Sequence, residues 1–128
     1  MKKIMSLTIV TLLLSGCSDG VYFKGMDDGD TVSSPLTVKM GVCGMDVQAA
    51  GNEVAGAGHH HLIVDGGGCI PEGETVPKDA NHIHFGKGQT ETVLDLAAGE
   101  HTLTLQFANG LHASYGESMC KLIHVHVK

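Results

Sequence analysis

The stretch that decides the fold class is residues 101–107, which read His-Thr-Leu-Thr-Leu-Gln-Phe. Its large apolar residues, Leu103, Leu105 and Phe107, are separated by single polar residues. Successive side chains of a β-strand point to opposite faces, so this alternation puts the apolar side chains together on one face. A helix would need apolar residues three and four positions apart. The stretch therefore predicts a half-buried β-strand.

The same alternation recurs in segments that are bounded by glycine, proline, asparagine and aspartate. Strands are predicted at residues 36–43, 60–65, 90–96, 101–107 and 121–127. No segment carries an amphipathic helical stripe with capping residues. Strands of this number and spacing predict a single all-β domain, an immunoglobulin-like antiparallel β-sandwich. In such a fold, His101 would stand where a corner tyrosine often reaches back to a backbone carbonyl.

The N-terminus predicts export across a bacterial membrane. Two lysines precede the apolar residues 4–14, a run that is too short to span a bilayer but typical of a secretory signal. The Leu-Ser-Gly-Cys motif that ends at Cys17 resembles a bacterial lipobox, in which the signal is cleaved before a cysteine that carries lipid. We expect a signal peptide at residues 1–16, an acidic tether at 17–30 and the β-domain at 31–128. Ser18 favours the outer membrane, with the domain facing the periplasm; an ordinary secreted protein is the alternative.

The charge balance excludes a nucleic-acid surface. The formal net charge is −6, and all eight basic residues are lysine. Nucleic acids and anionic lipids select clustered basic side chains, above all arginine, which makes paired contacts to phosphate. The sequence has neither arginine nor a basic stripe. We therefore expect contact with the membrane through the lipid anchor alone, and the sequence identifies no protein partner.

Four cysteines occur in the chain. With Cys17 used for lipid, three remain, and in an oxidising envelope compartment they allow one disulfide at most. The predicted strand order places Cys43 and Cys120 at the same end of the sandwich. They are therefore the expected pair, which leaves Cys69 as a free thiol.

Nine histidines are present, and they concentrate in two blocks, residues 59–61 and 82–84. Imidazole is the commonest metal ligand among side chains. In each block the first and third histidines share one face of a strand, so that one metal ion could bind both. The predicted strand order brings both blocks and a later loop to one end of the sandwich. The predicted metal ligands are His59, His61, His82, His84 and His112.

Other polar residues are expected to play supporting roles. His60, Gln89 and Glu91 could orient the ligating imidazoles from outside the site. The Gly-Lys-Gly-Gln-Thr-Glu segment that ends at Glu91 is more typical of a turn entering a strand. Turn-forming or solvent-facing positions are expected for Asp65, His124 and His126.

Two long blocks, GHHHLIVD at residues 58–65 and NHIHFGKGQTETVLDLAAGEHTLTLQFANGLHASYG at 81–116, resemble the bacterial family of unknown function DUF4399. In that family GHHHL(L/I)(I/V)D, HFGKGQTE and GxHTLTLxFAD segments recur in this order. The resemblance covers about residues 30–128 and implies one small secreted β-domain, but it implies no reaction. Cys120, His124 and His126 depart from the polar or β-branched residues that commonly close the last strand of the family.

Three classes of function are compatible with these residues. The favoured one is a cell-envelope lipoprotein that binds a transition metal ion through its clustered histidines. Copper ranks before zinc because imidazole sites bind Cu(II) most tightly among the divalent first-row ions. The alternative is an immunoglobulin-like interaction or assembly module without metal. An enzyme is least favoured, because the sequence has no nucleophile elbow, Cys–His signature or phosphate loop.

Overall fold

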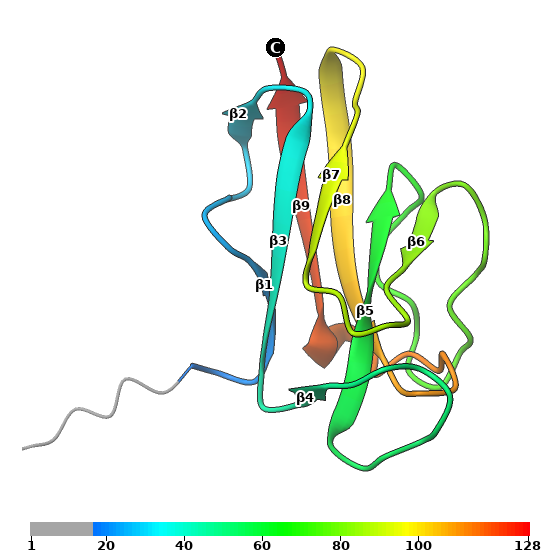
Figure 1. Ribbon diagram of the computed structural model, residues 1–128. Helices are drawn as coiled ribbons and strands as arrows, with labels where there is room; N and C mark the ends of the chain where they lie inside the picture. The colour runs from blue at the N-terminus through cyan, green and yellow to red at the C-terminus, as the bar shows by residue number, and fades with distance from the viewer. Residues whose placement is uncertain (1–16) are drawn as a thin grey trace, which may run out of the picture.

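The computed structural model describes residues 17–128, so the predicted signal peptide at residues 1–16 lies outside the described residues. The described part contains two β-sheets that pack face to face, with β3 and β7 in front of β8 and β9 (Figure 1). The strands are β1 (Gly20–Phe23), β2 (Asp30–Val32), β3 (Leu36–Cys43), β4 (Asp46–Val47), β5 (Ala57–Val64), β6 (His82–His84), β7 (Glu91–Leu94), β8 (Gly99–Ala108) and β9 (Cys120–Val127). One 3-10 turn, η1 (Glu117–Met119), precedes β9. Between residues 17 and 128, no helix has the length and apolar character needed to cross a membrane.

The strand order is that of an immunoglobulin-like sandwich. One sheet has the order β1-β3-β7, and the other has the order β2-β9-β8-β5-β4, with β6 also paired to β5. The pairs are antiparallel except for β2 with β9 and β4 with β5. The strands predicted at residues 36–43 and 90–96 thus lie in one sheet, and those predicted at 60–65, 101–107 and 121–127 lie in the other, as this fold requires. All five strands predicted from alternation are confirmed, with ends that move by a few residues.

The core lies between the sheets and contains the apolar faces that the alternation predicted. Leu103, Leu105 and Phe107 are completely buried. They face apolar side chains of the other sheet, including Val38 and Met40. Because each strand contributes every second residue, the two sheets supply one continuous apolar layer.

The folded domain begins earlier than the sequence predicted. Residues 20–23 form β1 and pair with β3, so the expected tether at 17–30 is largely part of the sandwich. Val21, Phe23 and Met26 are buried in the core. Acidic residues just after them suggested a solvated linker, but burial of these three apolar side chains outweighs the local charge.

The disulfide prediction was wrong in both its pair and its number. The structure joins Cys17 to Cys43 and Cys69 to Cys120. Cys43 pairs with Gly20 in the β3–β1 register, which puts the residues just before β1 beside the end of β3. Cys43 and Cys120 belong to different sheets. One sulfur cannot form both a disulfide and a lipid thioether, so the Cys17 disulfide and the predicted lipid anchor exclude each other.

Candidate metal centre

Two loops cover part of the outer face of the larger sheet, a face that alternation alone would leave to solvent. The loops at residues 65–81 and 109–116 run beside each other on the side of β5 that carries β6 (Figure 1). The amide of Val76 donates to the carbonyl of His112 over 3.0 Å, which joins the two loops. Beneath them, the polar residues Thr104 and Gln106 of β8 are completely buried. The loops therefore create a second, polar interior outside the sandwich.

Gln106 fastens both loops to the sheet. Its Oε1 accepts the amide proton of Ile70 at 2.9 Å, and its Nε2 donates to the carbonyl of Gly116 at 3.1 Å. The disulfide between Cys69 and Cys120 ties the first loop to the start of β9. A buried amide with satisfied hydrogen bonds gives this region a defined geometry.

Strand β5 sends its histidines to opposite faces. Its register pairs His60 with Phe107 on the core side and His61 with Gln106 on the outer side. His59 lies on the same outer face as His61, two residues away. Both outer histidines are buried under the loops, with exposed fractions of 0% and 3%. Their imidazoles therefore lie inside the polar layer.

Four imidazoles converge in that layer. His84 of β6 lies directly opposite His61 in the β5–β6 register, and His112 enters from the loop after β8. The ligand nitrogens of the four rings lie within 4.8 Å of one another. Nε2 of His59 is 3.2 Å from Nε2 of His84 and 3.2 Å from Nδ1 of His112. A tetrahedral ion with bonds of about 2.0 Å would separate its nitrogen ligands by about 3.3 Å.

The backbone around the cluster is shaped to admit these rings. A Cβ atom on Gly86 would lie 2.2 Å from the His84 ring, so glycine at this position leaves room for the imidazole. His112 has a φ of 67°, a conformation that is uncommon for residues other than glycine. The side-chain oxygen of Asn109 accepts the amide protons of Leu111 and Ala113, which holds His112 in this turn. Strain of this kind often marks a functional position.

Burial favours the neutral form of three of the four imidazoles, His59, His61 and His84. Burial lowers the pKa of His59 to about 4 and that of His61 to about 3, and the neighbouring histidine rings lower both further. Burial and then the His112 ring also lower the pKa of His84. A neutral imidazole has a free lone pair, so a metal ion would displace few protons on binding. Nδ1 of His61 is buried without a hydrogen-bond partner, which is compatible with a role as a metal ligand.

The donor set fits a borderline transition metal ion. The four candidate ligands are all nitrogen, without carboxylate or thiolate. Imidazole suits zinc, copper, iron and nickel, whereas magnesium and calcium require oxygen. The residues present can therefore hold a transition metal ion.

The family comparison covers this whole region. The family model described as Domain of unknown function (DUF4399) matches residues 38–128, a range that includes every strand contributing to the cluster. The chain belongs to the DUF4399 family. Neither a curated protein nor a solved structure matches the chain. The four clustered histidines of this DUF4399 domain all lie within the matched residues.

Four of the five predicted ligands are brought together, and the exception is His82. The β5–β6 register pairs His82 with Ile63, two residues along the strand from the His61–His84 pair. Its Nδ1 instead lies 2.6 Å from Oδ1 of Asp79, which also accepts the amide proton of His82. The spacing Asp-x-x-His was a sequence signal for this local turn. His82 and His84 share a face of β6, but only His84 lies within reach of the other clustered imidazoles.

The expected supporting residues do not contact the cluster. His60 lies on the core face with its ring edge against Phe107, at a centroid distance of 5.0 Å. Gln89 accepts the amide proton of Lys87, which confirms the turn interpretation of this segment. Glu91 is exposed and begins β7 in the other sheet. The residues that do organise the cluster, Gln106 and Asn109, were missed because the loops that they hold are distant in sequence.

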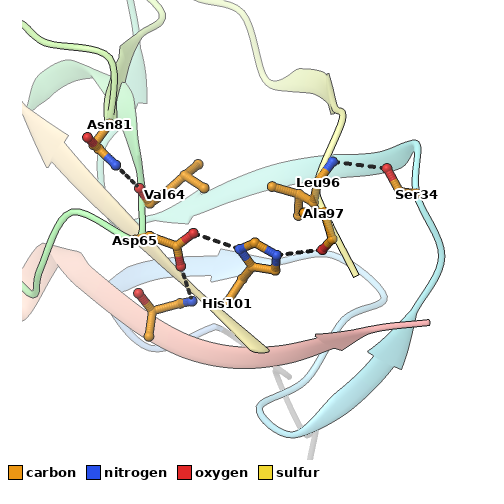
Figure 2. A network of polar contacts seen from close by, with 8 residues as sticks. Ser34, Val64, Asp65, Asn81, Leu96, Ala97 and His101 are labelled. Carbon is orange, nitrogen blue, oxygen red and sulfur yellow. Dashed lines mark hydrogen bonds and ion pairs between the residues drawn. The ribbon is translucent and has the colours of Figure 1, made fainter. Parts of the chain in front are cut away.

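A separate network supports the corner before β8, at the opposite end of β5 from His59 (Figure 2). His101 lies between Asp65 and Ala97, with Nδ1 2.6 Å from the carboxylate and Nε2 2.7 Å from the carbonyl oxygen. Asp65 also accepts the amide proton of Thr102. The structural role predicted for His101 and the turn predicted at Asp65 are confirmed. His124 and His126 are exposed on β9, where the alternation placed them.

Proposed function

We propose that this domain binds one transition metal ion in the bacterial cell envelope, with copper as the first candidate and zinc as the second. The ligands are His59, His61, His84 and His112. The observation that carries the proposal is the convergence of four imidazoles from three separate segments, with all ligand nitrogens within 4.8 Å. Burying several neutral imidazoles side by side is unfavourable unless something satisfies their nitrogens.

The preference for copper comes from the ligand chemistry. Divalent copper binds nitrogen sites more tightly than the other first-row ions, and zinc follows closely in tetrahedral sites. The nitrogen separations of 3.2 Å around His59 agree with a tetrahedral or distorted arrangement. Metal binding would also offset the cost of the strained φ of His112, because that backbone conformation places its imidazole in the cluster.

Location in the envelope is part of the same proposal. It is supported by the basic and apolar N-terminal residues and by the Cys69–Cys120 disulfide, since disulfides persist in oxidising compartments. The lipid anchor on Cys17 is proposed for the mature protein, in which it would replace the disulfide to Cys43. Mass spectrometry of the N-terminal peptide of membrane-extracted protein distinguishes the two. A peptide linked to Cys43 and carrying no lipid would refute the anchor.

The metal site is tested by calorimetry and chelator competition on tag-free protein that was purified without metal-affinity resin. We expect one equivalent of Cu(II) or Zn(II) to bind. His59→Gln, His84→Gln and His112→Gln should each weaken the affinity at least about tenfold, because each removes one ligand. Absence of stoichiometric binding of either ion at micromolar concentrations would refute the proposal and would favour the interaction module.

The chain provides a matched control for these variants. His82 belongs to the same His-Ile-His block as His84, but its ring contacts Asp79. His82→Gln should therefore leave metal affinity unchanged, as should His124→Gln on the far strand. If His82→Gln weakened binding as much as His84→Gln, the ligand set proposed here would be wrong.

The pH dependence provides a second readout. Four ordinary imidazoles would lose about 200-fold in apparent affinity between pH 7.5 and pH 6, because protons compete for the ligand nitrogens. Burial lowers the pKa of His59 to about 4 and that of His61 to about 3, so these two ligands stay neutral across this range. The apparent metal affinity should therefore fall by no more than about 15-fold between pH 7.5 and pH 6.

A further inference from the structure

A small pocket of about 60 Å³ opens beside the histidine cluster. Its lining consists of His61, His84 and His112 on the cluster side and Thr75, Val76, Pro77 and Lys78 from the loop between β5 and β6. His59 is not part of the lining and is completely buried. The pocket therefore meets the cluster on one side only, where three of the four imidazoles face it.

The charges around this pocket are unbalanced. Lys78 is the one charged side chain of its lining, and no lining residue between positions 17 and 128 is acidic. The carboxylate nearest in sequence, Asp79, contacts His82 instead. A divalent ion on four neutral imidazoles beside the Lys78 ammonium would bring three positive charges together without a negative side chain. Water screens the charge of the exposed Lys78, but it screens an ion beside the buried His61 less, so an accompanying anion would relieve the remaining repulsion.

We propose that the pocket binds a small monovalent anion, which would contact Lys78 and add to the four imidazoles as a further ligand of the metal ion. The inference rests on the proposed metal site and specifies the class of ligand that this site accepts. A volume of about 60 Å³ admits an anion the size of azide or formate, since a cavity of about 10–15 Å³ already holds one water. Val76, which is 4% exposed, supplies an apolar wall that reduces screening by water on one side of the pocket.

Lys78 is exposed, and its charge should act in opposite directions on the two ligands. A lysine beside a cation site repels the cation, so removing this charge should tighten metal binding. The same lysine attracts an anion, so removing it should weaken anion binding. Opposite effects on the two ligands are the signature of this arrangement, and a purely structural lysine would not produce them.

The test is an azide titration of the Cu(II)-loaded full-length mature protein, followed by visible absorption and electron paramagnetic resonance. We expect one azide to bind per copper with a saturable change in the copper spectrum. Lys78→Gln should weaken azide binding about tenfold and tighten Cu(II) binding several-fold. Lys78→Arg keeps the charge and should retain azide binding. Lys39→Gln, an exposed lysine of β3 in the other sheet, is the matched control and should change neither affinity.

The outcomes separate the two proposals. If copper does not bind in the initial titration, the metal site fails and the anion site fails with it. If copper binds but azide leaves its spectrum unchanged, the anion site alone is refuted. Equal azide affinities of the Lys78→Gln and Lys39→Gln proteins would likewise overturn the role of Lys78.

Discussion

Replacing His60 with leucine should make the metal-free protein less sensitive to mild acid. His60 is completely buried on the core face, and neither ring nitrogen has a hydrogen-bond partner. Burial, followed by the charges of His59 and Lys24, lowers the pKa of His60 to about 4 from its ordinary value of 6.5. The unfolded chain therefore takes up a proton near pH 6.5, whereas the folded chain resists it down to about pH 4. The sign is that of a depressed folded pKa: stability is full above pH 6.5 and falls as the pH drops towards 4.

The size of this effect follows from the two pKa values. At pH 5.5 the unfolded chain gains about 1.4 kcal/mol from protonation at this position, relative to pH 7.5. Leucine cannot be protonated, so the His60→Leu variant should lose about 1.4 kcal/mol less than the wild type over this interval. At pH 7.5 the change in unfolding free energy caused by His60→Leu is the sum of two opposing contributions. Removing the unsatisfied nitrogens gains about 1–3 kcal/mol, and losing the ring contact with Phe107 costs about 1 kcal/mol.

The measurement is urea unfolding at pH 7.5 and pH 5.5, in the presence of a chelator so that metal binding does not contribute. The difference between the two pH values is compared between wild type and variant, because packing changes cancel in that comparison. Ile123→Val, a core substitution that does not titrate and costs about 1 kcal/mol, should lose as much as the wild type on acidification. The reasoning from burial would be refuted if the losses of unfolding free energy between pH 7.5 and pH 5.5 differed by less than about 0.5 kcal/mol between the His60→Leu variant and the wild type.

Three further predictions follow from the described contacts. The hydrogen bond that His101 donates to Asp65, followed by that to a backbone carbonyl, raises the pKa of His101, so its stabilisation is present below pH 6.5 and is lost as the pH rises through its folded pKa. In urea titrations His101→Gln should therefore destabilise more at pH 5.5 than at pH 8.5, the opposite sign to His60, and equal losses would contradict it. His112→Gly should raise the thermal stability of the metal-free domain by about 1 kcal/mol while abolishing tight metal binding, because glycine accepts a positive φ. Replacing Cys69 and Cys120 together by serine should lower stability by about 3 kcal/mol in calorimetry, because the bond closes a loop between residues 51 positions apart, and an unchanged melting temperature would exclude that bond.

The fold was largely predictable because its determinants are local. Period-2 alternation at residues 36–43 and 101–107 assigned both the strands and their buried faces, since adjacent side chains of a strand must point in opposite directions. The strands that were missed, β1 and β4, have four residues or fewer, which gives only a weak periodic signal. Their positions depend on partners elsewhere in the chain.

The candidate site was predicted in its residue types but not in its composition. Alternation in each His-x-His block correctly separated His60 from His59 and His61. The same rule included His82, because it says which face a side chain occupies and not how far along the strand the partner lies. Register decided that point: His84 lies opposite His61, and His82 lies opposite Ile63.

By itself, the sequence determined an all-β domain rich in paired histidines, because alternation and residue type are properties of neighbouring positions. Only the tertiary structure decided which cysteines pair, that two loops cover the outer face of β5 and β8, and that Lys78 lies beside the cluster. These contacts join segments far apart in the chain. Their geometry depends on loop paths held by Gln106 and on the register of β6 against β5. Interactions of this kind leave no periodic trace in the sequence, because each is specified by a single pair of positions.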